Sequence, residues 1–93
     1  MLHLVAFPPS QTDLLPQFSA LLNQGDAIVL LDEGLAWLKN PDQLIASASQ
    51  TALHWYALIS DQDLACDARI QPLNYSDFIA LSEAHPACAC WYP

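Results

Sequence analysis

The sequence predicts a small α/β domain, with three layers and a mainly parallel sheet of four or five strands between short flanking helices. The segment Ala27–Leu31 is apolar at every position, whereas a strand with one solvent-exposed face alternates between apolar and polar residues. Strand-like and helix-like segments also alternate along the chain, which is typical of parallel strands joined by right-handed crossovers. We therefore expect one domain over residues 1–93.

Four segments have the character of strands. Leu2–Ala6 is apolar and stops at two prolines, and Ala27–Leu31 is the expected central strand. Ala52–Leu58 is rich in aromatic and branched residues, which favour strands. Arg69–Leu73 is a weaker strand, and Pro72 within it indicates that the strand lies at an edge or ends there, since proline cannot donate to a neighbouring strand.

The first helix is predicted over residues 14–22, where apolar side chains recur at spacings of three, four and seven. Asp13 is the expected N-cap, which places Pro16 in the first turn, where proline is tolerated. Gly25 is expected to close this helix as a C-terminal cap.

The later helices are expected to be short, so that the sheet would be incompletely covered and another subunit would have to close it. Ser76 is the expected N-cap of the last helix, which should end before His85 because the residue preceding a proline disfavours helical geometry. Residues 87–93 are interpreted as a tail. The remaining helical segments are expected within residues 35–38, 43–47 and 61–67.

The composition favours a subunit of a larger assembly. Hydrophobic residues make up 54% of the 93 positions and charged residues only 13%, which is more apolar material than a small core needs. Surplus apolar surface on a small domain indicates a subunit interface, with a dense core as the alternative. Tyrosine and tryptophan are enriched at interface centres. The interface candidates are Tyr75, Phe78, Trp91 and Tyr92.

The charge balance excludes several partners. Lys39 and Arg69 stand against ten acidic residues, which gives a formal net charge of −8. Nucleic-acid backbones and anionic membrane surfaces are bound by clusters of cations, so we expect neither as a direct partner. No apolar run approaches the ~20 residues of a membrane span. With no recognisable signal peptide, we expect a cytoplasmic chain with reduced thiols.

The turn Asp32, Glu33 and Gly34 follows the central strand, at the edge where open α/β sheets usually bind ligands. The chain has only one other glycine, Gly25, so neither the GxGxxG loop of dinucleotide-binding proteins nor a P-loop can exist. Adjacent residues at a strand end point to different sides, so the two carboxylates favour capping of the next helix over shared acid–base catalysis. We expect no catalytic residue, metal or cofactor.

The cysteine and histidine residues that could bind a soft metal ion or carry sulfur lie mostly near the end of the sequence. Cys88, Cys90 and His85 lie close in sequence, and His3 could complete a set of four. Thiolates carry persulfide sulfur, form disulfides or bind zinc or copper. However, a single Cys-x-Cys pair lacks the spacing of a structural zinc site, so we interpret both residues as small apolar side chains. Cys66 is interpreted as a buried structural cysteine, since neighbouring carboxylates disfavour its thiolate.

Several segments, taken together and in order, resemble the TusB/DsrH family of small α/β subunits. The resemblance covers essentially the whole chain. Its most specific parts are the central strand with its acidic turn and the Tyr-x-Asp-Phe-x-x-Leu helix. The segments are Met1–Leu4, Gly25–Gly34, Trp55–Leu58 and Asn74–Leu81, followed by His85 and Trp91.

This resemblance implies a hetero-oligomer with TusC-like and TusD-like subunits, arranged as a dimer of heterotrimers. Such a complex relays persulfide sulfur from a TusA-like donor to a TusE-like acceptor, for 2-thiolation of the wobble uridine of certain tRNAs. Related DsrEFH-like complexes serve dissimilatory sulfur oxidation. The family's relay cysteine lies mainly in the TusD/DsrE-type subunit, and the first-helix cysteine of some DsrH members is missing from residues 12–22 here.

The leading expectation is therefore a non-catalytic structural subunit of a sulfur-relay complex. One alternative is a direct persulfide carrier that uses Cys88 or Cys90 in a mobile C-terminal tail. Another is a homo-oligomer that binds a small ligand at the edge near Asp32.

Overall fold

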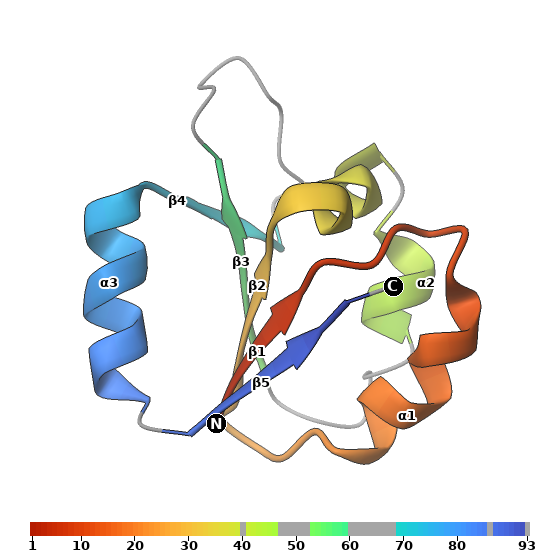
Figure 1. Cartoon of the computed structure of the whole chain (residues 1–93), viewed down its shortest axis with the longest axis horizontal. Coiled ribbons are helices and arrows are strands. Elements are labelled where there is room, and N and C mark those ends of the chain that lie inside the picture. Colours follow the sequence, from red (N-terminus) through yellow and green to blue (C-terminus); the bar gives the residue numbers. More distant parts are fainter. Residues whose placement is uncertain (40, 47–52, 60–68, 86, 93) are drawn as a thin grey trace.

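In a computed structural model of the chain, the described residues form five strands in a single parallel sheet (Figure 1). The structure describes residues 1–39, 41–46, 53–59, 69–85 and 87–92. The strand order is β4-β3-β2-β1-β5, which confirms the predicted fold class. The strands are β1 (Leu2–Val5), β2 (Ala27–Leu30), β3 (His54–Leu58), β4 (Gln71–Leu73) and β5 (Cys88–Trp91).

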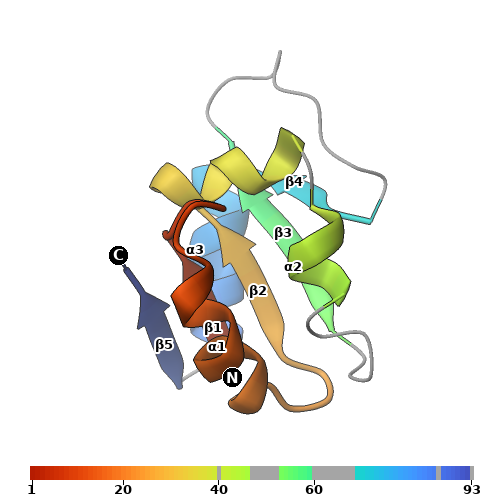
Figure 2. The same cartoon turned by 90° about the vertical axis from the view of Figure 1, so that its right-hand side faces the viewer.

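The helices lie on both sides of this sheet. Figure 2 shows α1, η2 and α2 in front of the strands and α3 behind them, so we call the two faces the α1 face and the α3 face. The predicted helix within residues 61–67, with Cys66, lies outside the described residues. The helices and 3₁₀ turns are η1 (Thr12–Leu14), α1 (Leu15–Ala20), η2 (Asp32–Lys39), α2 (Asp42–Ala46) and α3 (Tyr75–Ala84).

The larger part of the core lies on the α1 face. All four residues of β2 are buried, as predicted for a strand covered on both faces. Trp37 of η2 packs into this core, and its indole Nε1 donates a hydrogen bond to the carbonyl of Phe7 at 2.9 Å. The buried residues described on this face are Val5, Phe7, Leu15, Phe18, Ile28, Leu30, Trp37, Leu38, Leu44, Ala57 and Ile70.

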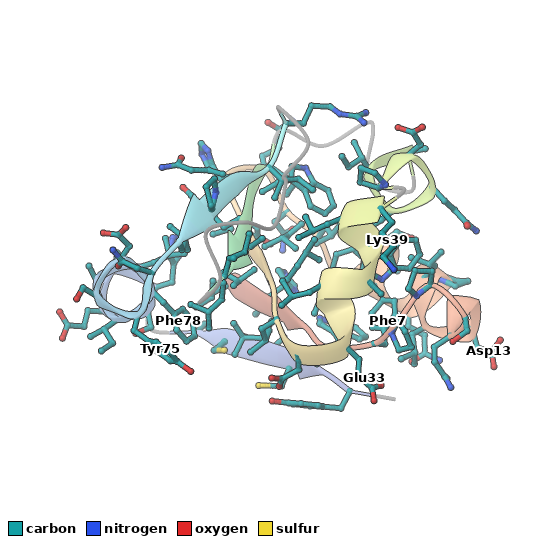
Figure 3. All side chains as sticks on the ribbon, turned by 90° about the horizontal axis from the view of Figure 1, so that it is seen from above. Phe7, Asp13, Glu33, Lys39, Tyr75 and Phe78 are labelled. Atoms are coloured by element: carbon teal, nitrogen blue, oxygen red, sulfur yellow. The ribbon has the colours of Figure 1, made fainter. Side chains whose placement is uncertain are left out.

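The α3 face has a much smaller core. Its buried residues within the described ranges are Leu2, Ala27, Val29 and Leu73. Helix α3, described throughout, has no buried residue. Phe78 is half-buried against this core, and Figure 3 shows it on the side of α3 that faces the sheet.

The predicted caps of the first helix are wrong. Residues 8–14 form successive tight turns, in which the amide of Gln11 bonds the carbonyl of Pro8 at 2.9 Å. Asp13 thus lies inside a 3₁₀ turn, and Leu14 takes the N-cap position of α1. The helix also ends early, at Ala20, so Gly25 does not cap it. Gly25 instead adopts φ +84° before β2, a backbone geometry that glycine tolerates.

Two predictions near the end of the chain are also corrected. Asn74, not Ser76, caps α3, because its side-chain oxygen accepts a hydrogen bond from the amide of Asp77 at 2.8 Å. The segment interpreted as a tail contains β5, which pairs in parallel with β1. The edge position predicted for Pro72 is confirmed, since β4 is the outer strand beside β3.

A substitution at Gly34 tests the contact between η2 and β1. A Cβ atom built at this buried residue would collide with the carbonyl oxygen of Val5 and lie 2.8 Å from its carbon. Because the obstructing atoms belong to the backbone of a central strand, we expect Gly34→Ala to lower the free energy of unfolding by about 1–3 kcal/mol. Urea unfolding measures this loss.

The matched control for this substitution is Gly25→Asn. No atom lies within 4 Å of a Cβ placed at Gly25, and asparagine tolerates a positive φ better than most residues. Its cost should stay below about 1 kcal/mol. Equal losses in the two variants would contradict the steric account of Gly34.

Candidate functional site

The predicted turn at the carboxyl end of β2 lies beside a small cavity. Asp32 adopts φ 52°, and both it and Glu33 are exposed in the first turn of η2. A carboxylate in a first helical turn stabilises the helix dipole. The cavity has a volume of about 140 Å³ and one carboxylate, that of Asp32, in its lining. The lining residues are Leu31, Asp32, Leu35, Leu58 and Tyr75.

Cys88 and Cys90 lie on the α3 face of the edge strand β5. In the parallel register with β1, Cys88 is opposite Leu2 and Cys90 is opposite Leu4, and Leu2 packs into the α3-face core. Both cysteines are free and exposed. Among the residues that the structure describes, no group of three His, Cys, Asp or Glu side chains is placed to hold a metal ion.

The environment of Cys88 disfavours its thiolate. Partial burial has the largest effect and raises the pKa of the Cys88 thiol, although the residue as a whole is exposed. The neighbouring Cys90 raises the pKa further, through its charge when ionised and through a hydrogen bond. A thiol with a raised pKa is a weaker nucleophile at neutral pH, because only the thiolate attacks.

Hydrogen bonds join Asp26, His3 and Trp91 into a set of side chains, here called the buried polar chain, which links β5, β1 and the residue that precedes β2. His3 is fully buried, and its Nε2 lies 3.0 Å from Oδ2 of Asp26. The indole Nε1 of Trp91 lies 3.2 Å from His3 Nδ1. An indole N–H can only donate, so Nδ1 accepts this bond and Nε2 carries the hydrogen that is donated to Asp26. The buried polar chain thus connects β5 to β1, and β1 to the residue that precedes β2.

Asp26 is the most extensively bonded carboxylate among the described residues. It is 3% exposed and accepts hydrogen bonds from the Met1 amine at 2.9 Å and the Asn23 amide at 2.9 Å, besides that from His3. Burial by itself would raise the pKa of Asp26, but the bonds from the amine, Asn23 and His3 together outweigh it and lower the pKa.

The sequence interpretation did not single out Asp26. The available signal was a carboxylate directly before a wholly apolar strand, with a histidine inside the neighbouring strand. Buried carboxylates need a partner, so these two features together could have suggested a pair. In the structure, His3 is that partner.

The four aromatic interface candidates lie in different surroundings. Tyr75 is 67% exposed and Tyr92 is 56% exposed. Phe78, a residue of α3, is half-buried against the core of the α3 face. Trp91 is half-buried on the α1 face, and the centroid of its ring lies 5.7 Å from that of Phe18. The structure therefore leaves the two tyrosines as the most accessible aromatic rings of this set.

These features define a class of protein: a small parallel α/β subunit, without a glycine-rich phosphate loop, that carries free thiols on an edge strand. A family model described as "DsrH like protein" matches residues 8–88. The chain belongs to this DsrH family, whose members act as sulfur-relay subunits in multi-subunit complexes. This confirms the resemblance found in the sequence. No curated protein sequence matches the chain significantly.

The described part of the chain has no helix long and apolar enough to cross a membrane.

Replacing Asp26 should remove a stabilising charge. Because the pKa of Asp26 is lower in the folded state, its contribution is complete above the ordinary aspartate pKa and is lost as the pH falls through the lowered value. We expect Asp26→Asn to destabilise the protein by about 1–3 kcal/mol at neutral pH. The difference from the original chain should shrink below about pH 4.

Urea unfolding over this pH range measures the effect. Asp13→Asn is the control, since Asp13 is exposed and Figure 3 shows it at the periphery. A constant difference between Asp26→Asn and the original chain at every pH would contradict the assignment.

The reactivity of Cys88 tests its protonation state. Because burial and Cys90 raise its pKa, alkylation by iodoacetamide at neutral pH should be slower than that of free cysteine. Cys90→Ala removes one of these causes and should accelerate the reaction at Cys88. Mass spectrometry of the peptide that contains Cys88 measures both rates, and a rate equal to or above that of free cysteine would refute the expectation.

Proposed function

We propose that the chain is a non-catalytic subunit of a TusBCD-like complex, in which TusC-like and TusD-like subunits cover its incompletely packed surface. The complex relays persulfide sulfur to a TusE-like acceptor, for 2-thiolation of the tRNA wobble uridine. The observation that carries this proposal is the unequal burial of the two faces of the sheet.

The α3 face supports the need for partners. Eleven buried residues form the described core of the α1 face, and only four form that of the α3 face. On this second face, Leu4 is only half-buried, while Cys88 and Cys90 are exposed. Tyr75 and Ile79 of α3 add side chains that are 67% and 55% exposed. Apolar surface concentrated in this way is typical of a site of protein association.

The state of the thiols supports a structural role over a chemical one. The raised pKa of Cys88 makes it a weak acceptor of sulfur at neutral pH. Both cysteines belong to a paired strand, whereas a carrier that moves between partners needs a mobile segment. The first helix, where some DsrH members carry a cysteine, has none in residues 12–22.

The charge of the chain supports delivery of sulfur through a protein acceptor. With a formal net charge of −8, this subunit would repel the phosphates of a tRNA. In the proposed complex the TusE-like protein carries sulfur onward, and the subunit itself needs no contact with RNA. Reduced thiols on its surface fit a cytoplasmic complex.

Assembly is the first test of the proposal. The chain is co-expressed with the TusC-like and TusD-like chains of the same organism and purified through a tag on one partner. We expect all three to elute together in gel filtration, as a species larger than any single chain. Separate elution of this chain, at concentrations where the other two associate, would contradict the proposal.

A second experiment tests both the pathway and the non-catalytic role. Deleting the gene should abolish wobble 2-thiouridine in tRNA, measured by mass spectrometry of nucleosides. A double variant, Cys88→Ser with Cys90→Ser, should restore the modification to the level given by the original chain. Unchanged 2-thiouridine in the deletion strain would favour the sulfur-oxidation alternative, and failure of the double variant alone would favour the persulfide carrier.

A further inference from the structure

The outer edge of β5 presents unpaired backbone groups. The carbonyls of Ala87 and Trp91 accept hydrogen bonds from the amides of β1 and the residue after it, at 3.0 and 2.9 Å. In a parallel pair, alternate residues of a strand direct both their N–H and C=O groups toward the same neighbour. The N–H and C=O groups of Cys88 and Cys90 therefore point away from β1, toward the open edge of the sheet.

This edge lacks the features that usually prevent strand pairing. Charged side chains, prolines and bulges protect the edges of natural sheets, but the strand Cys88–Trp91 itself contains neither charge nor proline, and Pro86 and Pro93 lie two positions outside it. The opposite edge differs, because β4 contains Pro72 within the strand itself, and proline has no N–H to donate to a further strand. Of the two edges of the sheet, that of β5 is the one open to a further strand.

The inner side of β5 is held firmly. The buried polar chain anchors Trp91 to His3, and the Trp91 ring also packs edge-to-face against Phe18. A strand fixed in this way loses little conformational freedom when a partner pairs with its outer side, which favours association.

We infer that β5 accepts an extended strand from a neighbouring, less acidic subunit of the relay complex, which continues the sheet beyond this chain. Pairing would satisfy the outward groups of Cys88 and Cys90. It would also bring partner side chains beside both thiols, on the incompletely covered α3 face. A second copy is the less favoured occupant, since each copy carries a net charge of −8 and like charges oppose association. The inference rests on the proposed function and adds the surface through which the partner binds.

A proline at position 90 tests the pairing. Cys90→Pro removes an outward N–H that β1 does not use, and proline is tolerated at such edge positions. Cys90→Ala is the matched control, because it also removes the thiol but keeps the N–H. Binding is measured by titration of each variant into the TusC-like and TusD-like pair. Because both variants lack the thiol, the comparison between them isolates the N–H, and we expect Cys90→Pro to bind at least about tenfold more weakly than Cys90→Ala.

Circular dichroism and thermal unfolding check that Cys90→Pro is folded. If it is not, hydrogen exchange in the original chain decides the question. The amides of Cys88 and Cys90 should exchange rapidly in the isolated chain and slowly in the complex, because pairing protects an amide.

Two results would overturn the inference while leaving the proposed function intact: equal binding by folded Cys90→Pro and Cys90→Ala, or rapid exchange of both amides in the complex. The inference would also be wrong if the isolated chain forms dimers and Cys90→Pro dissociates them, because a second copy would then occupy the edge of β5. Failure of the original chain to bind its partners would contradict both the inference and the proposed function.

Discussion

The buried polar chain of Asp26, His3 and Trp91 is the interaction on which the arrangement of the sheet depends. A histidine with no solvent exposure requires partners for both ring nitrogens, since an unpaired polar atom is costly in a protein interior. Here each nitrogen has one partner, and the two partners come from opposite sides of β1. The edge strand β5 is thereby placed in register with β1 by a specific side-chain bond as well as by its backbone ladder.

The two faces of the sheet differ because of how the crossovers are distributed. The connections from β1 to β2 and from β2 to β3 carry α1, η2 and α2, and all three pack on one face. Of the helices that the structure describes, α3 is the one on the other face, on the connection from β4 back to β5. On this face Leu2 of β1 is buried, but Leu4 is only half-buried and Cys88 and Cys90 of β5 are exposed. The surface proposed for partner binding and the exposed thiols thus lie on the same side of the molecule.

Local patterns in the sequence predicted the elements that depend on local physics. The unbroken apolar run of β2 indicated a doubly covered strand, and Pro72 indicated an edge. The N-caps of the helices were harder to predict. Asp13 and Ser76 have side chains suited to capping, but the N-cap positions are occupied by Leu14 and Asn74. The strand β5 was missed since four residues of mixed size, with a proline two positions away on each side, carry little strand signal. The bond between His3 and Trp91 spans 88 positions, and no spacing rule in a single sequence reveals such a contact.

The position of β5 also has a consequence for folding during synthesis. The strand β1 is synthesised before the other four described strands, yet one of its two neighbours in the sheet, β5, is synthesised after them. Until residues 88–91 emerge, β1 has an open side, and His3 lacks the donor for its Nδ1 atom. Contacts between segments so far apart in sequence form slowly. Until β1 and β5 pair, both strands expose apolar side chains. Their correct pairing therefore competes with aggregation.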